Sequence, residues 1–130
     1  MNSPPQIALI GYGVWGRQHA RVLRGLRALR WVYDSDSRQL KEASNSVDDL
    51  QFIWQDERVK GVVIATPPRT HFCLVADALK AGKHVLVEKP MTTSVSEALM
   101  LKETADKSGL TLMVGHLMRY HKGFQKFRFD

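Results

Sequence analysis

Five short apolar runs, separated by longer mixed segments, limit most strongly how this chain can fold. They lie at residues 6–10 (QIALI), 29–33 (LRWVY), 61–65 (GVVIA), 84–87 (HVLV) and 111–114 (TLMV). Nearly unbroken apolar runs of this length are typical of strands that are buried on both faces. Since the segments between them are long enough for helices, we predict an α/β chain with a doubly wound parallel sheet and helices on both faces.

The segments between the runs carry helical patterns. Apolar spacing predicts helices over residues 15–26, 70–81 and 94–109, and shorter ones over 36–43 and 48–55. Caps are expected at Asp36 or Ser37, and at Ser94 with Glu97 in a capping box. One face of the first helix carries apolar side chains, which we expect to pack on the sheet with the arginines opposite. This face consists of Trp15, His19, Val22, Leu23 and Leu26.

A glycine pattern follows the first predicted strand. Gly11, Gly13 and Gly16 in GYGVWG match G-x-G-x-x-G between a strand and a helix, where a Rossmann-type dinucleotide site requires it. The first glycine permits a tight turn, the second lets the backbone approach a diphosphate, and the third lets the helix pack close to the strand. Val14 and Trp15 begin the helix, whose N-terminal N–H groups attract phosphate. We predict a cofactor site that includes all five residues.

An acidic residue at the end of the second strand completes this pattern. Asp34 lies about 20 residues after the glycines, where a carboxylate accepts hydrogen bonds from the adenosine ribose. The same carboxylate repels a 2′-phosphate, so the sequence favours NAD over NADP as the cofactor. Arg38 leaves NADP open as the alternative cofactor, because an arginine shortly after this strand can bind the 2′-phosphate. The alternative for Asp34 is a helix cap or a turn residue.

Two longer segments resemble a known family. They are residues 62–101, with TPPRTH and AGKHVLVEKP, and residues 112–121, LMVGHLMRYH. Together with the glycine pattern they resemble the N-terminal domain of the glucose-fructose oxidoreductase, inositol dehydrogenase and rhizopine catabolism (Gfo/Idh/MocA) family over nearly the whole chain. The resemblance implies an NAD(P)-dependent oxidoreductase that acts on a sugar, a cyclitol or a related carbohydrate, such as a nucleotide sugar.

The resemblance also implies roles for particular residues. Thr66 and Pro67 match a loop that passes the diphosphate and the nicotinamide ribose, and His71 is expected near that ribose. Glu88 is similar to the residue that faces the same ribose. For His71 the alternative is a capping or core histidine.

Two further residues are implied to be catalytic. Lys89 resembles the lysine that contacts the reacting hydroxyl, before a proline, Pro90, whose peptide bond is often cis. His116 lies where the chain returns past the nicotinamide towards the substrate, as does Arg119. The alternative for Lys89 is an exposed lysine after a strand, and for His116 a capping or core histidine.

The chain departs from the family in two regions. After Ala43 there is little room for the usual third strand, so this edge strand is expected to be missing and the adenine pocket is in doubt. We expect residues 1–115 to form the dinucleotide-binding domain and 116–130 to begin the connection to a substrate domain that is absent here. The chain alone is therefore expected to be weak or inactive in catalysis. Phe124, Phe127 and Phe129 are expected to form an apolar surface for a partner or a second copy.

Composition limits the remaining function classes. With 44% hydrophobic and 25% charged residues the chain is typical of globular proteins, and its apolar runs are too short to span a membrane. The single cysteine, Cys73, and a polar start without a signal sequence favour the cytoplasm. No metal-ligand spacing is present, so no metal is expected.

Two alternative functions remain open at this stage. One is a non-catalytic NAD-binding or oligomerising module. The other is nucleic-acid binding through a basic helix face, because the net charge is +6 and Arg17, Arg21 and Arg24 recur at helical spacing. No aromatic residues interleave with these arginines to stack bases, so we expect no nucleic-acid partner.

Overall fold

A five-stranded parallel sheet forms the centre of the protein. The structure, a computed structural model, describes residues 3–129, and the side chains of residues 3–127. The strands are β1 (Gln6–Ile10), β2 (Leu29–Tyr33), β3 (Val59–Ile64), β4 (His84–Glu88) and β5 (Leu112–Gly115). Their order is β2-β1-β3-β4-β5, so the chain runs outwards from β1 in one direction and from β3 in the other. The predicted doubly wound parallel sheet is confirmed, with small differences at the strand ends.

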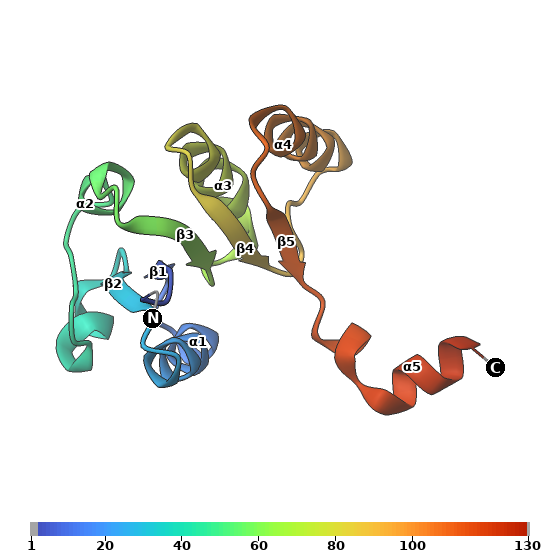
Figure 1. Ribbon diagram of the computed structural model, residues 1–130, viewed down its shortest axis with the longest axis horizontal. Coiled ribbons are helices and arrows are strands. Elements are labelled where there is room, and N and C mark those ends of the chain that lie inside the picture. The colour runs from blue at the N-terminus through green and yellow to red at the C-terminus, as the bar shows by residue number, and fades with distance from the viewer. Residues whose placement is uncertain (1–2, 130) are drawn as a thin grey trace.

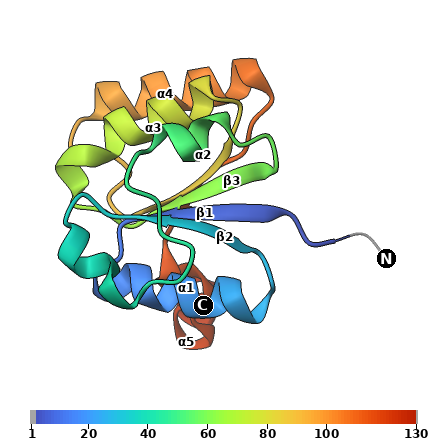
Figure 2. The same cartoon turned by 90° about the vertical axis from the view of Figure 1, so that its left-hand side faces the viewer.

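Helices cover both faces of this sheet. The α-helices are α1 (Val14–Gly25), α2 (Gln51–Gln55), α3 (His71–Lys80), α4 (Val95–Ser108) and α5 (Lys122–Phe129). Short 3₁₀ helices are η1 (Ser37–Glu42), η2 (Pro68–Thr70) and η3 (Leu117–Tyr120). Helices α2, α3 and α4 lie on one face and α1 on the other (Figure 2). The sequence did not predict η3 or α5, and α5 stands away from the sheet (Figure 1).

The core has two layers because the central strands are buried on both sides. In β3, Val62 and Ile64 pack in the layer that includes α3 and α4, whereas Val63 packs in the layer that includes α1. Burial on both faces is what makes such a strand apolar at every position. The predicted caps are also present, since Asp36 accepts the N–H of Arg38 and Ser94 accepts that of Glu97.

The buried face of α1 differs from the predicted one. Trp15, Val22 and Leu26 are 58%, 55% and 62% exposed, whereas Gly16 and Ala20 are buried. Because the helix packs close to the first strand, the small residues Gly16 and Ala20 lie against the sheet. Leu23, from the predicted face, is partly buried and packs in the same core layer as Ala20. The prediction is therefore right for Leu23 and wrong for Trp15, Val22 and Leu26.

The expected loss of the third strand is confirmed among the described residues. In its place, a single parallel bridge joins Val32 to Ser46 at the outer edge of β2. Val32 N–H donates to the Asn45 carbonyl at 3.0 Å, and Val47 N–H donates to the Val32 carbonyl at 2.9 Å. These bonds cover the middle of an edge strand that would otherwise expose its backbone groups.

Candidate functional site

The glycine loop between β1 and α1 has a different requirement at each glycine. Gly11 has φ +98°, and a Cβ there would lie 2.5 Å from the carbonyl oxygen of Ala65. A Cβ on Gly16 would lie 1.9 Å from the carbonyl oxygen of Gly11, so no side chain fits. At Gly13, by contrast, no protein atom lies within 4 Å of the Cβ position. Two glycines are required by the fold, and the third leaves open space beside the start of α1.

This open space has the electrostatics of an anion site. Gly13 is the N-cap of α1, and the first turn of the helix has no acidic side chain. The partial positive charge of the helix terminus is therefore not neutralised by the helix itself. Val14 and Trp15 lie in the same turn and are exposed. These features fit a diphosphate, which binds to helix N-terminal N–H groups where the backbone is accessible.

Asp34 joins this loop to the end of β2. Its Oδ2 accepts the N–H of Tyr12 at 2.7 Å, and its Oδ1 accepts the N–H of Asp36 at 2.8 Å. The carboxylate is thus held in a fixed orientation beside the glycine loop. Since a carboxylate oxygen has two lone pairs, each oxygen can accept one more hydrogen bond. Asp34 therefore fits a ribose site and also makes the turn contact that was its alternative role.

Arg38, the residue that left NADP open as a cofactor, forms an ion pair with Asp36 in this structure. Its Nε and Nη2 donate to the two carboxylate oxygens of Asp36 at 2.8 and 2.9 Å. These hydrogen bonds from Arg38 hold the pKa of Asp36 below its usual value. The Arg38 side chain is 81% exposed, so Asp36 competes for it with any phosphate at the end of β2.

A cavity of about 1090 Å³ lies at the carboxyl ends of β3, β4 and β5. It brings together predicted site residues that are far apart in sequence, namely Trp15, Thr66, Glu88, Lys89 and His116. Ligands of doubly wound sheets bind at this end of the strands. Gly11, Gly13 and Asp34 do not line this cavity and lie together at the ends of β1 and β2. The predicted residues therefore form two adjoining groups at one end of the sheet.

Glu88 occupies a confined place in this cavity. Its Oε1 lies 2.6 Å from Nε2 of His19 on α1, and the two side chains are 22% and 23% exposed. On the other side, a Cβ on Gly115 would lie 3.0 Å from Oε2 of Glu88. His19 was missed as a site residue because its position on the apolar stripe of α1 indicated packing. Its place on the helix that follows the glycine loop was the available signal.

His71 is a core residue that connects two loops. Its side chain is fully buried, with Nε2 2.8 Å from the Thr66 carbonyl oxygen and Nδ1 2.8 Å from the Pro90 carbonyl oxygen. The ring therefore bridges the loop after β3 and the loop after β4. This is the core placement that was the alternative to ribose contact. Pro67 precedes η2 in the first of these loops, and the expected cis peptide bond between Lys89 and Pro90 is present in the second.

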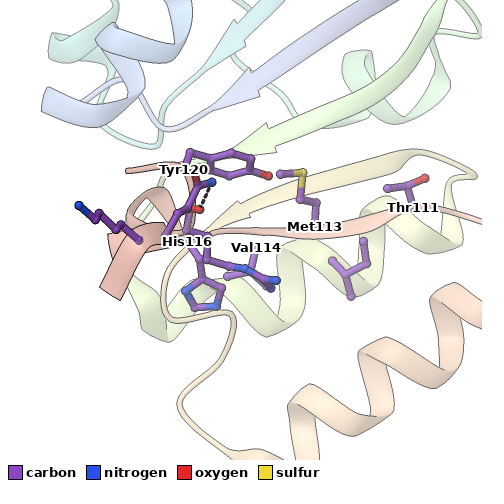
Figure 3. Close-up of a pocket in the computed structure, with 9 residues that line it drawn as sticks. Thr111, Met113, Val114, His116 and Tyr120 are labelled. Atoms are coloured by element: carbon purple, nitrogen blue, oxygen red, sulfur yellow. Dashed lines mark hydrogen bonds between the residues drawn. The ribbon is translucent and has the colours of Figure 1, made fainter. Parts of the chain in front are cut away.

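A second cavity lies beside the first, along β5 and the residues that follow it. Lys89 and His116 are both exposed. His116, Met113, Arg119 and Tyr120 line the first cavity and also a neighbouring one of about 1100 Å³ on β5. Figure 3 shows His116 and Tyr120 near the end of the strand, with the hydrogen bond of 2.8 Å from Gln125 to the Arg119 carbonyl as a dashed line.

Two of the basic residues on α1 contact an aromatic ring. The Arg17 guanidinium lies 5.0 Å from the centre of the Tyr12 ring, and Arg24 Nη2 donates to the Tyr12 hydroxyl at 3.2 Å.

Across residues 3–129, no cluster of three or more histidine, cysteine or acidic side chains could hold a metal ion. Within the same residues, no helix is long and apolar enough to cross a membrane.

The comparisons with known proteins agree with this geometry. Residues 6–116 match the model of the Gfo/Idh/MocA oxidoreductase family, NAD-binding Rossmann fold. UDP-N-acetylglucosamine 3-dehydrogenase of Acidithiobacillus ferrooxidans is 34% identical over 123 residues, which cover 92% of this chain and 39% of that protein. The scyllo-inositol 2-dehydrogenase (NADP(+)) IolW of Bacillus subtilis is 30% identical over 125 residues, which cover 92% of this chain and 35% of that protein.

Among solved structures, GenD2 from gentamicin A biosynthesis, in complex with NAD, matches with a TM-score of 0.79 at 32% identity. The match covers 88% of this chain and 36% of GenD2. The chain thus spans less than two fifths of the length of each of these three proteins. The family model covers residues 6–116, from the first strand to His116. On this evidence the chain belongs to the Gfo/Idh/MocA oxidoreductase family and has the NAD-binding Rossmann fold of that family.

Proposed function

We propose that this chain provides the NAD-binding part of an oxidoreductase. The reaction is hydride transfer between a nicotinamide cofactor and a carbon that carries a hydroxyl group in a sugar, a cyclitol or a nucleotide sugar. The observation that carries the proposal is the pair of adjoining sites at one end of the sheet. One has an open glycine loop beside Asp34, and the other is a cavity lined by Glu88, Lys89 and His116.

The proposed roles follow from what each group can do chemically. The N–H groups at the start of α1 bind the diphosphate, and Asp34 accepts hydrogen bonds from the adenosine ribose. Thr66 and Pro67 flank the path between the two halves of the dinucleotide, and Glu88 accepts from the second ribose. The nicotinamide ring, when bound, takes up or gives the hydride.

Lys89 and His116 are the proposed catalytic residues. The exposed amine of Lys89 donates a hydrogen bond to the substrate hydroxyl oxygen, and the imidazole of His116 accepts or returns its proton. The relatives are much longer than this chain, so we propose that residues 116–130 lead towards a substrate-binding region. Water must also be excluded from the nicotinamide for efficient transfer, and the open cavity does not do this alone.

Calorimetric titration of the chain with NAD and with NADP tests the cofactor assignment. We expect NAD to bind more tightly than NADP, and Asp34→Ala to weaken NAD binding because it removes the acceptor for the ribose hydroxyls. The variant Asp36→Asn, at the neighbouring half-buried carboxyl, is the matched control and should retain NAD binding. Absence of NAD binding by the unchanged chain would refute the proposal.

A non-catalytic NAD-binding or oligomerising module is the second candidate, favoured by the exposed side chains of Phe124 and Phe127 on α5. The side chain of Phe129 lies outside the described residues. NADH formation with a panel of sugars, cyclitols and nucleotide sugars separates the candidates. We expect slow, substrate-dependent NADH formation that disappears in Lys89→Met. NAD binding with no NADH formation would favour the module.

The compartment is also a proposal. We propose that the protein works in the cytoplasm, since its one cysteine, Cys73, is exposed and has no second cysteine in this sequence with which to form a disulfide. Fractionation of cells that express the tagged protein tests this, and recovery in the membrane fraction would contradict it.

A further inference from the structure

The contact between His19 and Glu88 joins two elements that belong to different halves of the candidate site. His19 is on α1, the helix that begins at the glycine loop, and Glu88 is the last residue of β4. The distance of 2.6 Å between Nε2 and Oε1 is that of a short, direct hydrogen bond. A carboxylate oxygen accepts, so the ring nitrogen that carries the proton here is Nε2.

Basic side chains also line the cavity around Glu88. They are Arg21 from α1, Lys89 after β4 and Arg119 after β5. A flexible glutamate among several cations has several favourable orientations. The contact with His19 selects one of them, in which Oε2 lies beside Gly115, where a Cβ would be 3.0 Å away. Holding a side chain in one orientation lowers the entropic cost of binding a ligand to it.

We propose that His19 is a positioning residue, which fixes the Glu88 carboxylate so that it can accept hydrogen bonds from the ribose next to the nicotinamide. This role rests on the proposed function, since it assigns Glu88 to that half of the dinucleotide. The adenosine half lies at Asp34 and the glycine loop, which His19 does not contact through any hydrogen bond found among the described residues. The role of His19 is therefore confined to the nicotinamide half.

Three ligands of increasing length separate this role from a general effect on folding. ADP reaches only the glycine loop and Asp34, whereas ADP-ribose and NAD also carry the second ribose. We expect His19→Leu to lower the affinity for NAD and ADP-ribose on the order of tenfold, as expected for loss of a hydrogen bond to a charged group. The affinity for ADP, measured by the same calorimetric titration, should remain unchanged.

Two further variants test whether the donor at Nε2 is what matters. The amide nitrogen of His19→Gln can occupy the place of Nε2, so this variant should bind NAD nearly as well as the unchanged chain. The shorter His19→Asn places its amide near Nδ1 and should behave like His19→Leu. This pair keeps the comparison valid if the leucine variant does not fold. In ¹⁵N NMR spectra, Nε2 of His19 should be the protonated nitrogen, and its signal should shift in Glu88→Gln.

Other results of these titrations would contradict the proposed role of His19. Equal losses for ADP and NAD would assign His19 to folding and overturn the inference. Unchanged NAD affinity in His19→Leu, or an equal loss in His19→Gln, would also overturn it. If the unchanged chain binds ADP-ribose and NAD no better than ADP, Glu88 has no role in ribose binding. If the unchanged chain binds none of the three ligands, the proposed function fails together with this role.

Discussion

At the scale of single residues, the three glycines of the loop show how a pattern in sequence combines two kinds of constraint. Gly11 and Gly16 are required because backbone atoms occupy the place of a side chain. Gly13 has a φ of −75°, which other residues adopt, and its Cβ position is open. The motif predicted these separate roles from the sequence. The structure adds which atoms would collide with a side chain at Gly11 and Gly16, and that the place beside Gly13 is open.

The different surroundings of Gly13 and Gly16 predict that one alanine substitution affects NAD binding and the other the stability of the fold. Gly13→Ala should change the free energy of unfolding by no more than about 0.5 kcal/mol, since the new methyl group meets no protein atom. Gly16→Ala should lower it by about 3 kcal/mol or more, because its Cβ overlaps the Gly11 carbonyl. Urea denaturation measures both. NAD titration of the stable Gly13→Ala protein should show weaker binding, and unchanged binding would mean that the diphosphate lies elsewhere.

Asp36 and Arg38 predict how the cofactor preference can be shifted. Asp36→Ala removes the carboxylate that holds the Arg38 guanidinium, which then becomes available to a 2′-phosphate. NADP affinity should rise on the order of fivefold, while NAD affinity changes little. The double variant Asp36→Ala with Arg38→Gln is the control and should lose the gain. A gain that persists in the double variant would show that Arg38 is not the phosphate ligand.

At the scale of elements, apolar runs and turn residues were enough to predict most strands and helices. The runs of β1 and β2 coincide with the observed strands because continuous burial leaves an unambiguous apolar signal. The face of α1 could not be predicted in this way. Its burial is decided by the distance between helix and strand, which the third glycine sets and which a hydrophobic pattern does not contain. The contact between His19 and Glu88 depends on the same packing and was missed for the same reason.

The packing of α1 predicts which of its residues tolerate change. Ala20 is fully buried against the sheet, so Ala20→Leu should lower the free energy of unfolding by about 1–3 kcal/mol through overpacking. Val22 is more than half exposed, and Val22→Thr should change the free energy of unfolding by less than about 0.5 kcal/mol. Thermal unfolding followed by circular dichroism compares the two variants. Equal destabilisation would mean that the apolar stripe, as the sequence suggested, faces the sheet.

At the scale of the whole molecule, the candidate site and a network of polar side chains lie at opposite ends of the sheet. The candidate site lies at the carboxyl ends of the strands. At the opposite end, Asp56 accepts hydrogen bonds from Arg30 and from Trp31, the latter at 2.8 Å. The Nζ of buried Lys83 donates to the Asp56 carbonyl oxygen at 2.8 Å, and burial lowers the pKa of Lys83. This network could not be predicted from the sequence, because its members are separated along the chain and match no motif.

Asp56 predicts a loss of stability in acid. Burial alone would raise the pKa of Asp56, but the hydrogen bonds from Trp31 and Arg30 outweigh it and lower the pKa to about 2. A carboxyl whose pKa is lower in the folded state stabilises the fold above its unfolded pKa. This contribution, about 2 kcal/mol, is present above about pH 4 and is lost as the pH falls towards 2. Urea denaturation between pH 6 and 2 should show this loss, and Asp56→Asn should remove that part of the pH dependence.

The parallel sheet, and the positions of the glycine loop after its first strand and of Asp34 after its second, could be predicted from the sequence because motif and apolar pattern agree. The position of η3 and α5, beyond β5, could not be predicted, since their apolar side chains are exposed and belong to neither core layer. The central claim is that a dinucleotide diphosphate binds at the start of α1. The most direct test is to add NAD to the ¹⁵N-labelled chain and map the amide shifts. The largest shifts should occur at Gly13, Val14 and Trp15, and shifts confined to other surfaces, or none, would contradict the account.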